Sequence, residues 1–167
     1  MSTDYIKAIV RQTIPADCLA PIERWLLTRI FETEERGDSL VFYGSWDYGY
    51  GAVFDGVSPD DKLTEALTAS REICPELCAE VERTINKSEK SEEFRINYER
   101  IFQSIVRRHP DVLHHVSIED FDCNSRQGLL CETLTIITAQ SIMSINSYGA
   151  IHQRQWNSLL RYIERCT

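Results

Sequence analysis

The chain has 167 residues, of which 43% are apolar and 26% charged, and its net charge is −8. A chain of this length and apolar content can bury a core of its own, which excludes a disordered chain and predicts one globular domain over residues 1–167. No run approaches the ~18 apolar residues of a membrane span, and no export signal marks the start of the sequence. We therefore expect a soluble, cytoplasmic protein without membrane attachment.

The cysteines are spread along the chain rather than grouped. They stand at Cys18, Cys74, Cys78, Cys123, Cys131 and Cys166. Without an export signal, and in a chain large enough to fold without cross-links, disulfides are not expected. We interpret these residues as reduced thiols, most of them packed as small apolar groups.

The first forty residues predict two helices. Apolar spacing indicates a first helix over residues 4–13, ending at Ile14–Pro15 because the residue before proline leaves the α region. Pro21 suits the first turn of a second helix, and Gly37 suits the position just after its end. The apolar stripe of this second helix is Ile22, Trp25, Leu26 and Ile30.

The character of the sequence changes at Ser39. Residues 39–43 and 52–54 are short β-rich runs, and the glycines and Asp47 between them favour turns. We predict a small β-hairpin or an ordered aromatic loop within residues 39–55.

Helical patterns return in the middle of the chain. The sequence from Ser58 to Asp61 combines a capping serine, a proline and two acids, which is typical of a helix start. Pro75 begins another helix that carries Leu77, Cys78, Val81 and Ile85 on one face. A further helix runs from about residue 91 to His109, where Pro110 ends it.

The last third is read as one irregular segment over residues 112–121 and two helices. Residues 129–143 are apolar nearly all round, and we favour a buried helix over a strand because the run exceeds the usual strand length of ~5–6 residues. Residues 150–165 carry the pattern of a final helix. The predicted fold is therefore mainly α, a single-domain irregular bundle of about seven helices with one small hairpin.

Acidic residues concentrate in one stretch of the sequence. Residues 32–61 hold eight acids and one base, Arg36, so this stretch carries −7 of the net charge. Such a field attracts basic proteins and repels nucleic-acid phosphate, although acidity can also serve solubility alone. The rings within this stretch supply rigid contact area for a partner, or pack into the core of the hairpin itself. The predicted partner-binding residues are Glu34, Glu35, Asp38, Trp46, Asp47, Tyr48, Tyr50, Asp55, Asp60 and Asp61.

Two other clusters contain residues that can bind metals. Residues 114–123 gather His114, His115, three acids and a cysteine, but without the repeated ligand spacing of a metal site, so a solvated turn is the simpler interpretation. The three-residue gap between Cys74 and Cys78 differs from that of a zinc or redox pair. We predict no metal and no cofactor.

Three functions remain open on this sequence. We favour a small acidic cytoplasmic protein that docks onto or neutralises a basic protein partner, as an inhibitor or a toxin-immunity protein does, and that does not bind nucleic acid. The first alternative is a helical adaptor or scaffold subunit of a larger assembly. The second is an enzyme, for which His114, His115, Glu119 and Asp122 are the only plausible site.

Overall fold

A computed structural model describes residues 8–44, 61–87, 97–122 and 130–146. These residues form a seven-stranded antiparallel sheet and four α-helices, so the prediction of a mainly α bundle with one small hairpin is wrong. The strands are β1 (Ala8–Val10), β2 (Ile14–Pro15), β3 (Glu32–Arg36), β4 (Ser39–Gly44), β5 (His115–Asp122), β6 (Leu130–Thr138) and β7 (Ile142–Asn146). The helices are the short 3-10 turn η1 (Ala16–Cys18), α1 (Pro21–Ile30), α2 (Asp61–Ser70), α3 (Pro75–Lys87) and α4 (Tyr98–Arg108).

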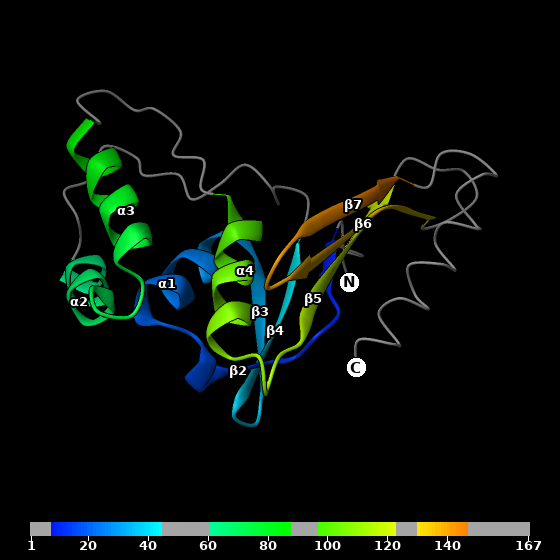
Figure 1. Ribbon diagram of the computed structural model, residues 1–167, viewed down its shortest axis with the longest axis horizontal. Helices are drawn as coiled ribbons and strands as arrows, with labels where there is room; N and C mark the ends of the chain where they lie inside the picture. Colours follow the sequence, from blue (N-terminus) through cyan, green and yellow to red (C-terminus); the bar gives the residue numbers. More distant parts are fainter. Residues whose placement is uncertain (1–7, 45–60, 88–96, 123–129, 147–167) are drawn as a thin grey trace, which may run out of the picture.

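The sheet carries its helices on one side (Figure 1). Strand β4 pairs with β3 along one edge and with β1 and β2 along the other, and β1 continues the sheet through β5 and β6 to β7. Helices α1 and α4 lie nearest the sheet, while α2 and α3 form a second tier that packs on α1. No helix in these ranges is long and apolar enough to cross a bilayer.

The core lies between the sheet and the inner helices. Four aromatic rings meet edge to face or tilted at its centre, with centroid separations of 5.3–6.2 Å between partners: Phe31, Phe42, Tyr98 and Phe102. Such pairs contribute beyond the area that they bury, so they fix α4 over the junction of α1 with the β3–β4 hairpin.

The predicted helix over residues 4–13 is wrong where the structure describes it, since Ala8–Val10 form β1. Ile9 pairs with Tyr43 on one side and with Glu119 on the other. A short apolar run fits helical and strand periodicity equally well, and pairing with distant strands decides between them.

The second helix was predicted too long. It begins at Pro21 as expected but ends at Ile30, and Glu32–Arg36 turn back as a strand against β4. Gly37 adopts the left-handed backbone conformation, φ 61°, in the two-residue turn that joins Arg36 to Ser39. A Gly-Asp pair suits a two-residue hairpin turn, although the charged residues 32–36 before it are not β-rich. The β3–β4 hairpin precedes residues 39–43, whereas the predicted hairpin follows them.

The last third was also misassigned. The segment expected to be irregular contains β5, and the helix expected over residues 129–143 is replaced by β6 and β7. Ile137 packs into the core between sheet and helices, whereas Leu134 and Ile136 are buried on the other face of β6. A strand that is buried on both faces shows no alternation of apolar and polar residues, which explains its resemblance to a buried helix.

The predicted helices of the middle region are confirmed as α2, α3 and α4, although α4 begins at Tyr98 and not at about residue 91 as predicted. The Asn97 side chain caps α4 by accepting a hydrogen bond from the Arg100 N–H at 3.2 Å, and the helix ends at His109, before Pro110. The strand predicted at residues 39–43 is confirmed as β4. Three predicted segments lie outside the described residues: the aromatic loop after Gly44, the β-rich run at residues 52–54 and the final helix at residues 150–165.

Candidate functional site

The predicted docking residues do not all fall on one surface. Glu34 and Glu35 lie on β3, Asp38 lies in the β3–β4 turn, and Asp61 begins α2. In Figure 1 the β3–β4 turn lies at the bottom of the view and α2 at its left, apart from the turn. Outside the described residues lie Trp46, Asp47, Tyr48, Tyr50, Asp55 and Asp60.

The β3–β4 hairpin presents its acids to solvent. Glu34 accepts two hydrogen bonds of 3.1 Å from Arg36, whose hydrogen bonds and charge lower the pKa of that carboxyl. Glu35 accepts one of 3.0 Å from Arg24. Exposed pairs of this kind contribute little to stability, so a basic partner can replace the internal cation at small cost. Among the described strands, none pairs with the outer edge of β3, which leaves these side chains accessible along it.

A groove of about 580 Å³ lies beside the turn of the hairpin. Its charged lining consists of three carboxylates and one guanidinium, from Asp17, Glu35, Asp38 and Arg24, a net charge of −2. Asp17 belongs to η1, which is tied to the turn by a hydrogen bond of 2.8 Å from the Ala16 N–H to the Asp38 carbonyl. Within the ranges described, neither Asp17 nor Asp38 takes part in an ion pair, so both carboxylates can pair with an incoming cation.

A second groove, of about 640 Å³, runs between α3 and α4. Its α3 wall carries Glu76 and Glu80, and its α4 wall carries Arg100, Arg107 and Arg108. Three guanidinium groups stand against two carboxylates, a net charge of +1, so this groove does not favour a basic partner. The hairpin groove, with its excess of negative charge, is the better candidate for the predicted function.

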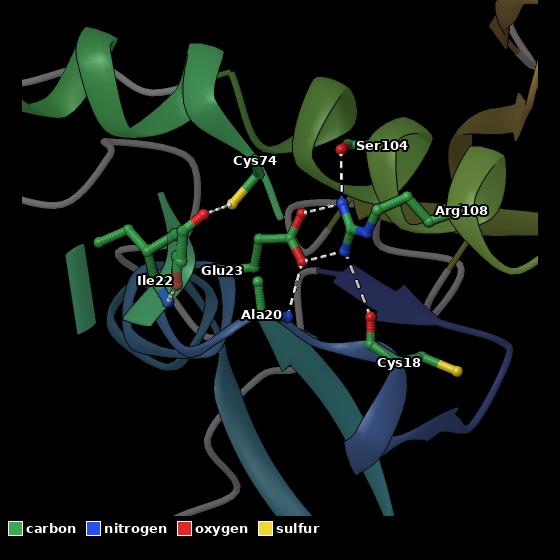
Figure 2. A network of polar contacts seen from close by, with 8 residues as sticks. Cys18, Ala20, Ile22, Glu23, Cys74, Ser104 and Arg108 are labelled. Atoms are coloured by element: carbon green, nitrogen blue, oxygen red, sulfur yellow. Dashed lines mark hydrogen bonds and ion pairs between the residues drawn. The ribbon is translucent and has the colours of Figure 1, made fainter. Parts of the chain in front are cut away.

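A buried ion pair holds the wall of the hairpin groove in place (Figure 2). Glu23 on α1 is fully buried and accepts hydrogen bonds from both terminal nitrogens of Arg108 on α4, at 2.6 and 2.8 Å. The same carboxylate accepts from the Ala20 N–H at 2.9 Å, while Arg108 also donates to the Ser104 hydroxyl and to the Cys18 carbonyl. Because Cys18 ends η1, this network fixes η1, and with it Asp17, against the two inner helices.

Sequence reasoning missed this network. Arg108 and its partner Glu23 are 85 residues apart in the sequence. The one local signal is Glu23 at the third position of a helix that begins with proline, where a carboxylate reaches back to the N–H before the helix.

The alternative catalytic cluster does not converge. His114 is exposed just before β5, while His115 and Glu119 share one face of that strand, four residues and about 13 Å apart. The backbone of Asp122 is seven residues beyond His115, or about 24 Å along the strand. Glu119 forms an ion pair with Arg11. General acid–base catalysis needs groups within hydrogen-bond reach of one substrate, and this arrangement does not provide it.

The described cysteines are buried free thiols: Cys18, Cys74 and Cys78. Burial raises the pKa of Cys74 to about 12, helped by the charge of Glu23, and its thiol donates to the Ser70 carbonyl at 3.6 Å. Burial likewise raises the pKa of Cys18 and Cys78. Thiols kept protonated in this way are poor nucleophiles and poor metal ligands. No group of three potential metal ligands occurs within the described part of the chain.

Comparison with protein-family models, with curated proteins and with solved structures finds no match for this chain. The function proposed below therefore rests on the geometry and charge of the hairpin groove alone.

Proposed function

We propose that this chain is a small acidic protein of the reducing cytoplasm that docks onto or neutralises a basic protein partner, in the manner of an inhibitor or a toxin-immunity protein. The observation that supports the proposal is the hairpin groove, where Asp17, Glu35 and Asp38 outnumber Arg24. A guanidinium or ammonium group from the partner enters this groove and pairs with Asp17 and Asp38.

The chain's overall charge fits the same role. A net charge of −8 steers a basic partner toward the molecule, and it repels the phosphates of DNA and RNA. Steering of this kind raises association rates by about one to three decades and is weakened by salt. Close pairing inside the groove then slows dissociation.

The support structure of the groove suits recognition rather than catalysis. The turn is held by the left-handed Gly37 and by the hydrogen bond from Ala16, and η1 is held by Arg108. The backbone at Asp17 and Asp38 is thereby held in place before a partner arrives, which reduces the entropy lost on binding.

Carbodiimide cross-linking tests the proposal, because it joins a carboxylate directly to a contacting lysine. The full chain is treated in an extract of its native cells, and the cross-linked carboxylates are mapped by mass spectrometry. We expect links from Asp17, Glu35 or Asp38 to the lysines of one recurrent basic protein, and their loss in the variant Asp17→Asn/Asp38→Asn. The matched control Asp111→Asn changes an exposed acid outside the hairpin groove and should leave the links intact. Links confined to Glu76 and Glu80 would place any docking surface on α3 and contradict the proposal.

A further inference from the structure

Gln12 occupies an unusual place between β1 and β2. The backbone pairing of β1 with β5 ends at Val10 and Ile118, followed by one more hydrogen bond from the Arg11 N–H to the Ser117 carbonyl. The Gln12 side chain then continues the pairing. Its Oε1 accepts from the Ser117 N–H at 2.6 Å and from the Ser117 hydroxyl at 3.2 Å.

This contact fixes the orientation of the Gln12 amide. A backbone N–H can only donate, so the amide atom that faces it must be the oxygen. The amide nitrogen therefore points to the other neighbour, the Nε2 atom of His115, at 3.0 Å. An amide NH₂ group can only donate as well, so Nε2 must carry its lone pair, and the proton of the neutral ring lies on Nδ1.

Protonation of His115 removes this arrangement. A proton on Nε2 would face the NH₂ group of Gln12, donor against donor. Turning the amide around would satisfy the imidazolium but would set its NH₂ group against the N–H of Ser117. No orientation of Gln12 bonds both neighbours once His115 is charged.

We propose that Gln12 and His115 form a proton-sensitive joint between the β1–β2 connection and strand β5, closed while His115 is neutral and opened when Nε2 takes up a proton. The residues that follow the connection, Pro15 to Asp17, line the hairpin groove. The joint thus lies at the start of one wall of that groove, although it does not depend on what the groove binds.

The surroundings of His115 favour the neutral ring. The half-buried position of the side chain and the charge of the adjacent His114 both lower the pKa of His115, burial being the larger cause. Across the sheet it faces the uncharged Thr138. The charged and titratable groups on the elements packed around it are His114 and Glu119 on or beside β5, Arg11 before Gln12, Arg107 on α4, and His109 and Asp111 in the turn before β5.

The test is an NMR titration of the full chain, with labelled histidines and with amide exchange followed at Ser117. In the wild type we expect the Nδ1–H tautomer at neutral pH and a midpoint for His115 below the ordinary value of about 6.5. We also expect the Ser117 amide to lose protection, relative to its intrinsic exchange rate, as His115 becomes charged. A neutral ring with its proton on Nε2, or protection of Ser117 that is unchanged through the titration, would overturn the proposal without any variant.

The variant Gln12→Glu should reverse the direction in which the pKa of His115 is shifted. A carboxylate accepts from the Ser117 N–H and from the protonated Nε2 at once, so the pKa of His115 should rise by about one unit or more, roughly tenfold in proton affinity. Ser117 should then stay protected while His115 is charged. In the control His114→Gln, which removes only the neighbouring charge, Ser117 protection should still follow the state of His115. An equal midpoint in wild type and Gln12→Glu would show that Gln12 does not control the ring.

Discussion

Replacing Arg108 by methionine should be among the most destabilising single changes in the described structure. Glu23 is fully buried, and its carboxylate accepts three hydrogen bonds, two from Arg108 and one from the Ala20 N–H. In Arg108→Met only the bond from Ala20 remains, and the charge cannot reach water. Breaking a buried pair in this way costs about 3–5 kcal/mol, a large part of the ~5–15 kcal/mol that holds a typical domain together.

The partner substitution Glu23→Gln should cost less, about 1–3 kcal/mol, because it leaves no buried negative charge and because Arg108 keeps 21% of its side chain exposed to solvent. The double variant Glu23→Leu/Arg108→Met removes both charges and fills the space with apolar atoms. It should therefore be at least ~2 kcal/mol more stable than the sum of the separate losses in Glu23→Leu and Arg108→Met predicts.

Equilibrium unfolding in urea at neutral pH measures these free energies, provided that all variants unfold with the same slope. The control is Arg71→Met, which breaks an exposed ion pair of 2.7 Å with Glu82 and should change stability by no more than ~0.5 kcal/mol. A loss below ~1 kcal/mol in Arg108→Met, or strict additivity in the double variant, would refute the role given to the pair.

Three further outcomes follow from single residues. Gly37→Ala should lower the free energy of unfolding in urea by about 1 kcal/mol, and Gly37→Asn by less, because asparagine tolerates the left-handed backbone better than alanine does. No atom lies within 4 Å of an added Cβ, so the backbone is the source of the strain. Equal losses in the two variants would contradict this. Cys74 should resist alkylation in the native state near neutral pH and react after unfolding. A pKa of about 12 leaves roughly a thousandfold less thiolate than the ordinary pKa of 9.0 would. Rapid labelling of the native protein would show that burial does not protect this thiol. Because the pKa of His115 is lowered in the folded protein, the native state binds fewer protons than the unfolded chain near pH 6. The contribution of His115 to stability is therefore full above about pH 6.5, and it is lost as the pH falls through the pKa of His115 in the folded state. Unfolding free energies measured across that interval should decline in the wild type and decline less in Gln12→Glu.

The predicted elements that hold are those whose signals are local. Helix α3 begins at a proline, α4 ends before one, and both carry an apolar face at helical spacing. These signals depend on neighbouring residues alone, so the sequence is enough to read them.

The strands depend on partners that are distant in sequence. Ile9 becomes part of β1 only because β4 and β5 lie on either side of it, and β6 forms because it pairs with β5 and β7, with both of its faces buried over residues 134–137. The Gly37–Asp38 turn offered a local signal for the β3–β4 hairpin, but Gly37 was interpreted as the residue that follows a helix end.

The candidate site was predictable in part for the same reason. The acids of β3 and Asp38 are visible as a run of charge, whereas Asp17 joins them only through the contact of η1 with the turn. The ion pair that holds η1 joins residues 85 positions apart, and no local pattern reports such a contact.

The central claim, that the hairpin groove receives cationic groups, is tested most directly by an NMR titration of the labelled full chain with an oligo-arginine peptide. We predict saturable shifts centred on the amides of Asp17, Gly37 and Asp38, weakened by salt and lost in Asp17→Asn/Asp38→Asn but retained in Asp111→Asn. Shifts spread evenly over the acidic surface, or centred on Glu76 and Glu80 of α3, would contradict the account.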